Sequence, residues 1–128
     1  FFGRNLPLRN DQKLLFFEHF KKECAVLGEM AELLKKSIDA VQSPNNPSFI
    51  DFHARRLVEI GGFIAISYLL ILDSERCTCE KNCYEQSARR FVRYAQAQIM
   101  ERVLLINDID VATYEKDYAS VADSTPVE

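Results

Sequence analysis

The stretch "SPNNPS", Ser43–Ser48, divides the first half of the chain, because two prolines and two asparagines cannot continue an α-helix. Upstream of it, apolar residues recur at alternating gaps of three and four, which predicts one long helix capped by Asn10 or Asp11. We expect the chain to reverse its direction at the break. The positions of this heptad seam are Phe17, Phe20, Cys24, Leu27, Ala31, Leu34, Ile38 and Val41.

A second helix is predicted downstream of the break and runs to about Leu72. Ser48 and Asp51 lie three residues apart, which resembles a capping box at the start of this helix. Its second half, "IGGFIAISYLLIL" over residues 60–72, is apolar on all sides. A helix with no polar face is typical of the interior of a bundle, so we expect this segment to lie in the middle.

Two glycines interrupt this apolar half of the second helix. Gly61 and Gly62 each cost about 1 kcal/mol relative to alanine in a helix interior, which predicts that another backbone approaches closely there. The apolar run over residues 60–72 is shorter than the roughly 20 residues that a membrane-spanning helix needs. We therefore expect a buried helix and no membrane partner.

A third helix is predicted from about Tyr84 to Asn107, followed by Asp108 and Asp110, which can cap a short fourth helix over residues 111–118. No run alternates between apolar and polar residues for long enough to indicate a strand. The apolar side of the third helix again shows helical spacing, at Ala88, Phe91, Val92, Ala95, Ile99, Val103 and Ile106.

The sequence therefore predicts an all-α, up-down bundle of three long helices and a short fourth. We expect residues 10–119 to form this bundle, residues 1–9 to be a linker from an upstream region, and residues 120–128 to be a disordered tail. The chain opens on "FFGRNLPLRN", with no methionine and nothing before Phe1 and Phe2 for them to pack against. This opening leads us to expect a piece of a longer polypeptide.

Charge and composition narrow the class of protein. The formal net charge is −3, which gives no reason to expect a nucleic-acid partner, since such proteins carry a strongly basic face. No basic segment followed by an apolar run stands at the N-terminus, so a secretory signal is not indicated and we expect a cytoplasmic protein.

Three cysteines are concentrated in the stretch "RCTCEKNCYE", residues 76–85. Cys77, Cys79 and Cys83 are the candidate metal ligands, but their C-x-C-x3-C spacing differs from that of structural zinc sites, and no fourth ligand lies nearby in the sequence. A reducing compartment also argues against a structural disulfide. We interpret this stretch as a helix-to-helix connection whose cysteines stay reduced and without a metal.

The remaining candidates for chemistry are His53 and a set of arginines. His53 can act as a general base, but a single histidine in the first turns of a helix is more often structural. The arginines at positions 55, 56, 89, 90 and 93 can gather to bind an anion, although a solvated face balanced by Glu59 and Glu85 is the simpler interpretation. Tyr68, Tyr84 and Tyr94 are expected to line the core with their hydroxyls at its edge.

Three segments carry a resemblance to a known family. They are "FFGRNLPLRN" at the start of the chain, "FIDFHARRLVEIGGFIAISYLLILDSER" over residues 49–76, and "YEQSARRFVRYAQAQIMERVLLI" over residues 84–106. Together they resemble the C-terminal helical extension of large bacterial acyl-CoA dehydrogenases of the methylthiopropanoyl-CoA dehydrogenase-like type. In that family a segment similar to residues 3–7 ends the flavin-bearing region. The cysteine stretch departs from the family pattern, in which a plain polar turn is expected.

The resemblance implies a parent enzyme that holds FAD and oxidises an acyl-CoA between its α and β carbons. The family's glutamate base and its main flavin contacts lie in the preceding region, so no catalytic or cofactor-binding residue is carried onto this chain. Glu59 and Glu101 stand in no motif that matches the base. The implied partners are the upstream catalytic domain, a neighbouring subunit in a homo-oligomer, and acyl-CoA for the parent. The alternative is a freestanding helical interaction or dimerisation module.

Overall fold

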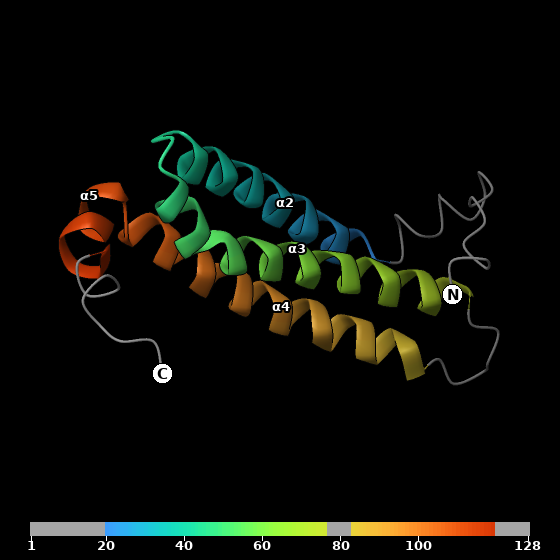
Figure 1. Cartoon of the computed structure of the whole chain (residues 1–128). Coiled ribbons are helices and arrows are strands. Elements are labelled where there is room, and N and C mark those ends of the chain that lie inside the picture. The colour runs from blue at the N-terminus through green and yellow to red at the C-terminus, as the bar shows by residue number, and fades with distance from the viewer. Residues whose placement is uncertain (1–19, 77–82, 120–128) are drawn as a thin grey trace.

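The computed structural model describes residues 20–76 and 83–119 of the 128-residue chain. These residues form no strand, and three long helices run side by side, each packed against the other two (Figure 1). The predicted all-α bundle of three long helices and a short fourth is confirmed for this part of the chain. The elements are α2 (Lys21–Gln42), α3 (Pro47–Arg76), α4 (Cys83–Asp108), α5 (Val111–Tyr114) and a π-helical turn, η2 (Glu115–Ala119).

The predicted boundaries of the helices need small corrections. The second long helix continues to Arg76 rather than ending near Leu72, so the charged residues that follow the apolar run belong to the helix. The predicted start of the first helix, the linker over residues 1–9 and the tail over residues 120–128 lie outside the described residues.

The core is shared by all three long helices. α3 contributes to each of its three clusters, through Ile60 and Ile64 in the middle, Ile71 at one end and Phe49 at the other. The prediction that the apolar second half of this helix lies in the middle of the bundle is wrong, because α2 also packs directly against α4 and only 28% of the most apolar window of α3 is buried. The buried residues that α4 adds are Ala88, Val92, Ala95, Ile99, Val103 and Ile106, which match the predicted apolar side.

The start of α3 is capped by a different residue from the one predicted. The Asn46 side-chain oxygen accepts hydrogen bonds from the backbone N–H groups of Ser48, at 3.1 Å, and Phe49, at 3.3 Å. Asn46 is therefore the cap, and Pro47 occupies the first helical position, where its missing N–H costs nothing and its fixed φ suits a helix. The predicted capping box of Ser48 and Asp51 is wrong because the cap and the start of the helix lie two residues earlier. The predicted cap of the fourth helix is confirmed, since Asp110 accepts a hydrogen bond from the Thr113 N–H at 2.8 Å.

The buried side of α2 is rotated relative to the predicted seam. Phe20, Leu27 and Val41 are buried as expected, whereas Ala31 is exposed and Cys24 and Ile38 are only half-buried. The positions buried in place of these three are Glu23, Met30 and Ser37, each one residue earlier. The rotation arises because α2 packs against both α3 and α4, so its buried stripe faces the groove between two helices instead of a single partner.

The outward side of α3 is not covered, although the helix is apolar. A Cβ added at Gly61 would touch only Leu34 Cδ2, at 3.9 Å, and one added at Gly62 would meet nothing within 4 Å. No other backbone within the described residues therefore approaches these glycines, contrary to our prediction. Val58 is 74% exposed and Ile66 is 47% exposed on the same helix.

The length of α3 also changes the membrane argument. Within the described residues, α3 is long and apolar enough to span a bilayer, with a mean hydropathy of 1.7 over its best 18-residue window, of which 28% is buried. The length of the apolar run over residues 60–72 therefore underestimates the apolar length of α3, because an 18-residue window also includes the residues on either side of that run. A single such helix is weak evidence for a membrane, since the central helix of a bundle meets the same criteria of length and composition.

Candidate functional site

His53 is the titratable residue of α3 that lies deepest in the bundle. Its side chain is completely buried, and its ring packs edge-on against Phe49 and Phe52, with ring centroids 5.0 and 4.9 Å away. Nε2 lies 2.9 Å from the carbonyl oxygen of Ile109, in the turn between α4 and α5. Nδ1 lies 3.4 Å from a terminal nitrogen of Arg56, one turn further along α3. His53 therefore connects α3 to the turn that carries the last helix.

These two partners fix the protonation state of the imidazole. A carbonyl oxygen can only accept a hydrogen bond and a guanidinium can only donate one, so Nε2 carries the proton and Nδ1 accepts. Burial lowers the pKa of His53, an effect opposed by the hydrogen bond to Ile109 and reinforced by the charge of Arg56. The ring is thus held neutral near pH 7, because an imidazolium would be desolvated next to a cation.

The geometry of His53 favours a structural role over general-base catalysis. A general base needs a free ring nitrogen within reach of a substrate proton, and here both nitrogens are engaged and the ring has no exposed surface. Arg56 is itself held by the Phe52 carbonyl oxygen at 3.2 Å and stacks over the Phe52 ring, 5.1 Å from its centroid. The contacts of His53 and Arg56 connect α3 to the turn between α4 and α5, and they leave no ring nitrogen of His53 free to accept a proton from a substrate.

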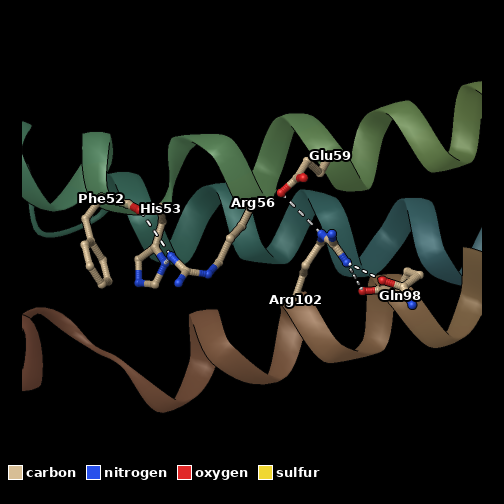
Figure 2. A network of polar contacts seen from close by, with 6 residues as sticks. All are labelled: Phe52, His53, Arg56, Glu59, Gln98 and Arg102. Atoms are coloured by element: carbon tan, nitrogen blue, oxygen red, sulfur yellow. Dashed lines mark hydrogen bonds and ion pairs between the residues drawn. The ribbon is translucent and has the colours of Figure 1, made fainter.

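A second polar cluster joins the middle of α3 to α4. Figure 2 shows Arg102 reaching from α4 toward Glu59 on α3, with Gln98 one turn away on its own helix. Arg102 Nε lies 3.4 Å from a Glu59 oxygen, and one terminal nitrogen donates to the backbone and side-chain oxygens of Gln98, each at 3.0 Å. The guanidinium also lies over the Phe63 ring, 5.1 Å from its centroid. Two of the three guanidinium nitrogens of Arg102 therefore bind protein groups.

A third cluster joins the start of α4 to the start of α2. Arg89 pairs with Glu23 at 2.9 Å and with Glu85, one turn earlier on α4, at 3.3 Å. Its guanidinium also lies 4.9 Å from the centroid of the Phe20 ring. Glu23 is only 9% exposed, so the pairing satisfies a carboxylate that would be costly to bury alone.

The arginines singled out from the sequence do not gather at one place. Arg55 and Arg56 lie near the start of α3, whereas Arg89, Arg90 and Arg93 lie near the start of α4. Because α3 and α4 run in opposite directions, these two groups are at opposite ends of the bundle (Figure 1). The five arginines therefore do not form one anion site. The expected balance by Glu85 is found at Arg89, but Glu59 pairs with Arg102, which was not among them.

The cysteine candidates fall largely outside the structure. Cys77 and Cys79 lie outside the described residues, and Cys83 is the first residue of α4, with a side chain that is not described. Among the described residues, no three His, Cys, Asp or Glu side chains are grouped so that they could hold a metal. Our interpretation that these three cysteines stay reduced and bind no metal therefore remains a prediction. Cys24 is half-buried, and burial is the main cause that raises the pKa of its thiol.

The tyrosines divide between the core and the surface. Tyr68 packs against the two larger core clusters, as predicted, and burial raises the pKa of its hydroxyl. Tyr94 is 53% exposed instead, and it forms a surface aromatic cluster with Phe63 and Phe91, at centroid distances of 5.9 and 6.0 Å. The expectation that Tyr94 lines the core is therefore wrong. Tyr84 has a side chain that is not described.

Three arginines of the described residues are already engaged within the bundle. Arg56, Arg89 and Arg102 are each held by protein carbonyls, carboxylates or aromatic faces. We therefore derive no chemical step through FAD on this part of the chain. Sequence reasoning missed Glu23 and Arg102, because the partner of Glu23 lies 66 residues away and that of Arg102 lies 43 residues away.

One comparison with known proteins identifies a relationship. Residues 7–113 match the model of the family described as "Acyl-CoA dehydrogenase C terminal", and this range contains all three long helices. No curated protein and no solved structure matches the chain.

Proposed function

Because the chain belongs to the family of acyl-CoA dehydrogenase C-terminal domains, we propose that it acts as a non-catalytic helical domain that packs against the catalytic body of such an enzyme. The observation that carries this proposal is the family match over residues 7–113, which spans most of the bundle. The polar clusters agree with it, because their ionisable groups bind one another across helices instead of converging on an open site.

The wider activity is part of the proposal. The parent enzyme would hold FAD in a region that precedes this chain and would remove hydrogen from the α and β carbons of an acyl-CoA. The narrower type that we propose is the methylthiopropanoyl-CoA dehydrogenase-like branch, and its support is the resemblance of residues 3–7 to the end of the flavin-bearing region. The bundle would contribute packing area to the catalytic body or to a neighbouring subunit.

The experiment that tests this proposal compares two proteins. One is the 128-residue chain, and the other is the same chain extended upstream along its reading frame. We expect flavin absorbance near 450 nm and acyl-CoA-dependent reduction of a dye only in the extended protein. FAD and turnover in the 128-residue chain alone would overturn a non-catalytic role. If the upstream reading frame ends within a few residues, no catalytic body precedes this chain and the proposal is wrong.

The alternative is a freestanding interaction module, and one observation favours it. α3 keeps an exposed apolar side that neither α2 nor α4 covers within the described residues, and such surfaces in soluble proteins are typical of interfaces. The length of the upstream frame discriminates between these two functions, because only the enzyme domain requires a catalytic region before it.

A further inference from the structure

The outward face of α3 consists of Val58, Gly62, Ala65, Ile66 and Leu69. These residues recur at gaps of three, four or one along the helix, on the side opposite the buried Ile60, Ile64 and Ile71, and all except the half-buried Leu69 are exposed. Within the described residues, nothing lies within 4 Å of a Cβ built at Gly62, in the middle of this face. Water-exposed apolar side chains on one helix face are costly unless a partner covers them.

Two opposite charges bracket this outward face. Arg55 precedes it and Asp73 follows it, and both lie on the same side of the helix as Gly62 and Ile66. Neither Arg55 nor Asp73 makes an ion pair or side-chain hydrogen bond with the described part of the chain. The face therefore carries a positive charge at one end and a negative charge at the other.

We propose that the outward face binds the same face of a second copy of this chain, with the two α3 helices antiparallel. Arg55 and Asp73 each lie nine residues from Ile64, on opposite sides of it, and Gly62 and Ile66 each lie two residues from it. A two-fold axis at the level of Ile64 therefore sets Arg55 opposite Asp73 of the second copy and Gly62 opposite its Ile66. One axis satisfies both pairings, which is the self-complementarity that a two-fold interface requires.

The shapes of the paired residues suit this arrangement. A Cβ built at Gly62 meets nothing within 4 Å, so the backbone there leaves room for a large side chain from outside the bundle. Ile66 is half-exposed and projects from the next turn of the same face. In the antiparallel pair each Ile66 fills the space above the Gly62 of the other copy, and Val58 lies at the level of Leu70 of the other copy. Small residues at such a crossing let two helix backbones approach closely.

The length of the face argues for a protein partner and against a bilayer. Its apolar part, from Val58 to Leu69, extends about 17 Å along the helix, whereas the hydrocarbon core of a membrane is about 30 Å thick. Arg55 and Asp73 lie about 27 Å apart along the same face, so a spanning helix would place a charge of each sign at or inside the edges of the hydrocarbon. A second copy neutralises both charges.

The test measures self-association of the 128-residue chain under reducing conditions, which prevents disulfide-linked dimers. Sedimentation velocity over a hundredfold range of concentration should show a monomer–dimer equilibrium. Ile66→Glu should weaken the dimer at least about tenfold, because it buries two carboxylates per interface. Leu104→Glu is the matched control, since Leu104 is 68% exposed on α4, away from this face, and it should leave the equilibrium unchanged.

A charge exchange tests the antiparallel register itself. Arg55→Asp and Asp73→Arg should each weaken the dimer, by about tenfold at low salt, because each variant creates two like-charge contacts. The double variant restores opposite charges and should recover dimerisation. Gly62→Leu should block close approach, whereas Gly28→Leu, at an exposed and equally open position on α2, should not. Circular dichroism of every variant verifies that the bundle is folded.

Several results would overturn the proposal. They are a monomer at every concentration, a dimer that Ile66→Glu leaves intact, and a double charge variant that stays as weak as the single ones. A monomer that co-sediments with phosphatidylcholine–phosphatidylglycerol vesicles would assign the face to a membrane instead. These outcomes are distinct from a failure of the proposed enzyme-domain function, because self-association of this chain is measured without any upstream region.

Discussion

Replacement of the buried His53 by phenylalanine should destabilise the bundle and remove part of its sensitivity to acid. Phenylalanine keeps the aromatic contacts with Phe49 and Phe52 but leaves the Ile109 carbonyl oxygen without its donor at 2.9 Å. A buried carbonyl that loses its partner costs about 1–3 kcal/mol. His53→Ala adds a cavity to this loss and should cost about 3–5 kcal/mol, as for other large aromatic side chains replaced by alanine.

The pH dependence separates the titration of His53 from its packing. Burial lowers the pKa of His53 below that of the unfolded chain, so between the two values the unfolded state binds more protons than the folded state. The free energy of unfolding is therefore fully retained above the unfolded pKa of about 6.5 and falls as the pH drops below it, by at most about 1.4 kcal/mol per pH unit. The loss ends at the lowered pKa of the folded state.

Urea unfolding at a series of pH values from 8 to 5 measures both effects. The difference in unfolding free energy between wild type and His53→Phe should be largest at pH 8 and should shrink as the pH falls below 6.5. His53→Gln is the matched variant, because its amide keeps a donor near Ile109 without a titratable ring. If the unfolding free energies of wild type and His53→Phe change in parallel with pH over this range, the imidazole is not held buried and neutral.

Three further predictions concern pairing, capping and thiol chemistry. In urea titrations, Glu23→Ala should lower the unfolding free energy by about 1–3 kcal/mol, because it removes a buried partner of Arg89. Glu85→Ala should lower it by less than about 1 kcal/mol, because Glu85 is less buried. Equal losses for the two variants would contradict this ranking. Asn46→Ala should cost about 1 kcal/mol of thermal stability by calorimetry, whereas Ser48→Ala should be nearly neutral, and the reverse order would restore the capping box. Cys24 should react with a disulfide reagent at pH 8 more slowly in the folded chain than in urea, because burial raises its thiol pKa; equal rates would show an open site.

The candidate site was predictable only in part. His53 and the arginines were visible as residue types, but the sequence carried no sign that the imidazole would meet a carbonyl 56 residues away. Glu23 was not expected to be buried, because the seam placed Cys24 on the inner side of the helix and Glu23 beside it. Its partner Arg89 becomes visible only when α4 is docked against α2.

The sequence by itself determined the number, type and order of the helices. The prolines and asparagines of residues 43–48 end one helix and begin the next, and Asp110 begins the last, because these residues act on backbone groups within one turn. The tertiary structure decided which side of each helix is buried. α2 turned Met30 inward and Ala31 outward because two neighbours, not one, cover it. Rotation of a helix about its axis leaves its own backbone hydrogen bonds unchanged, so only packing between distant segments can select it.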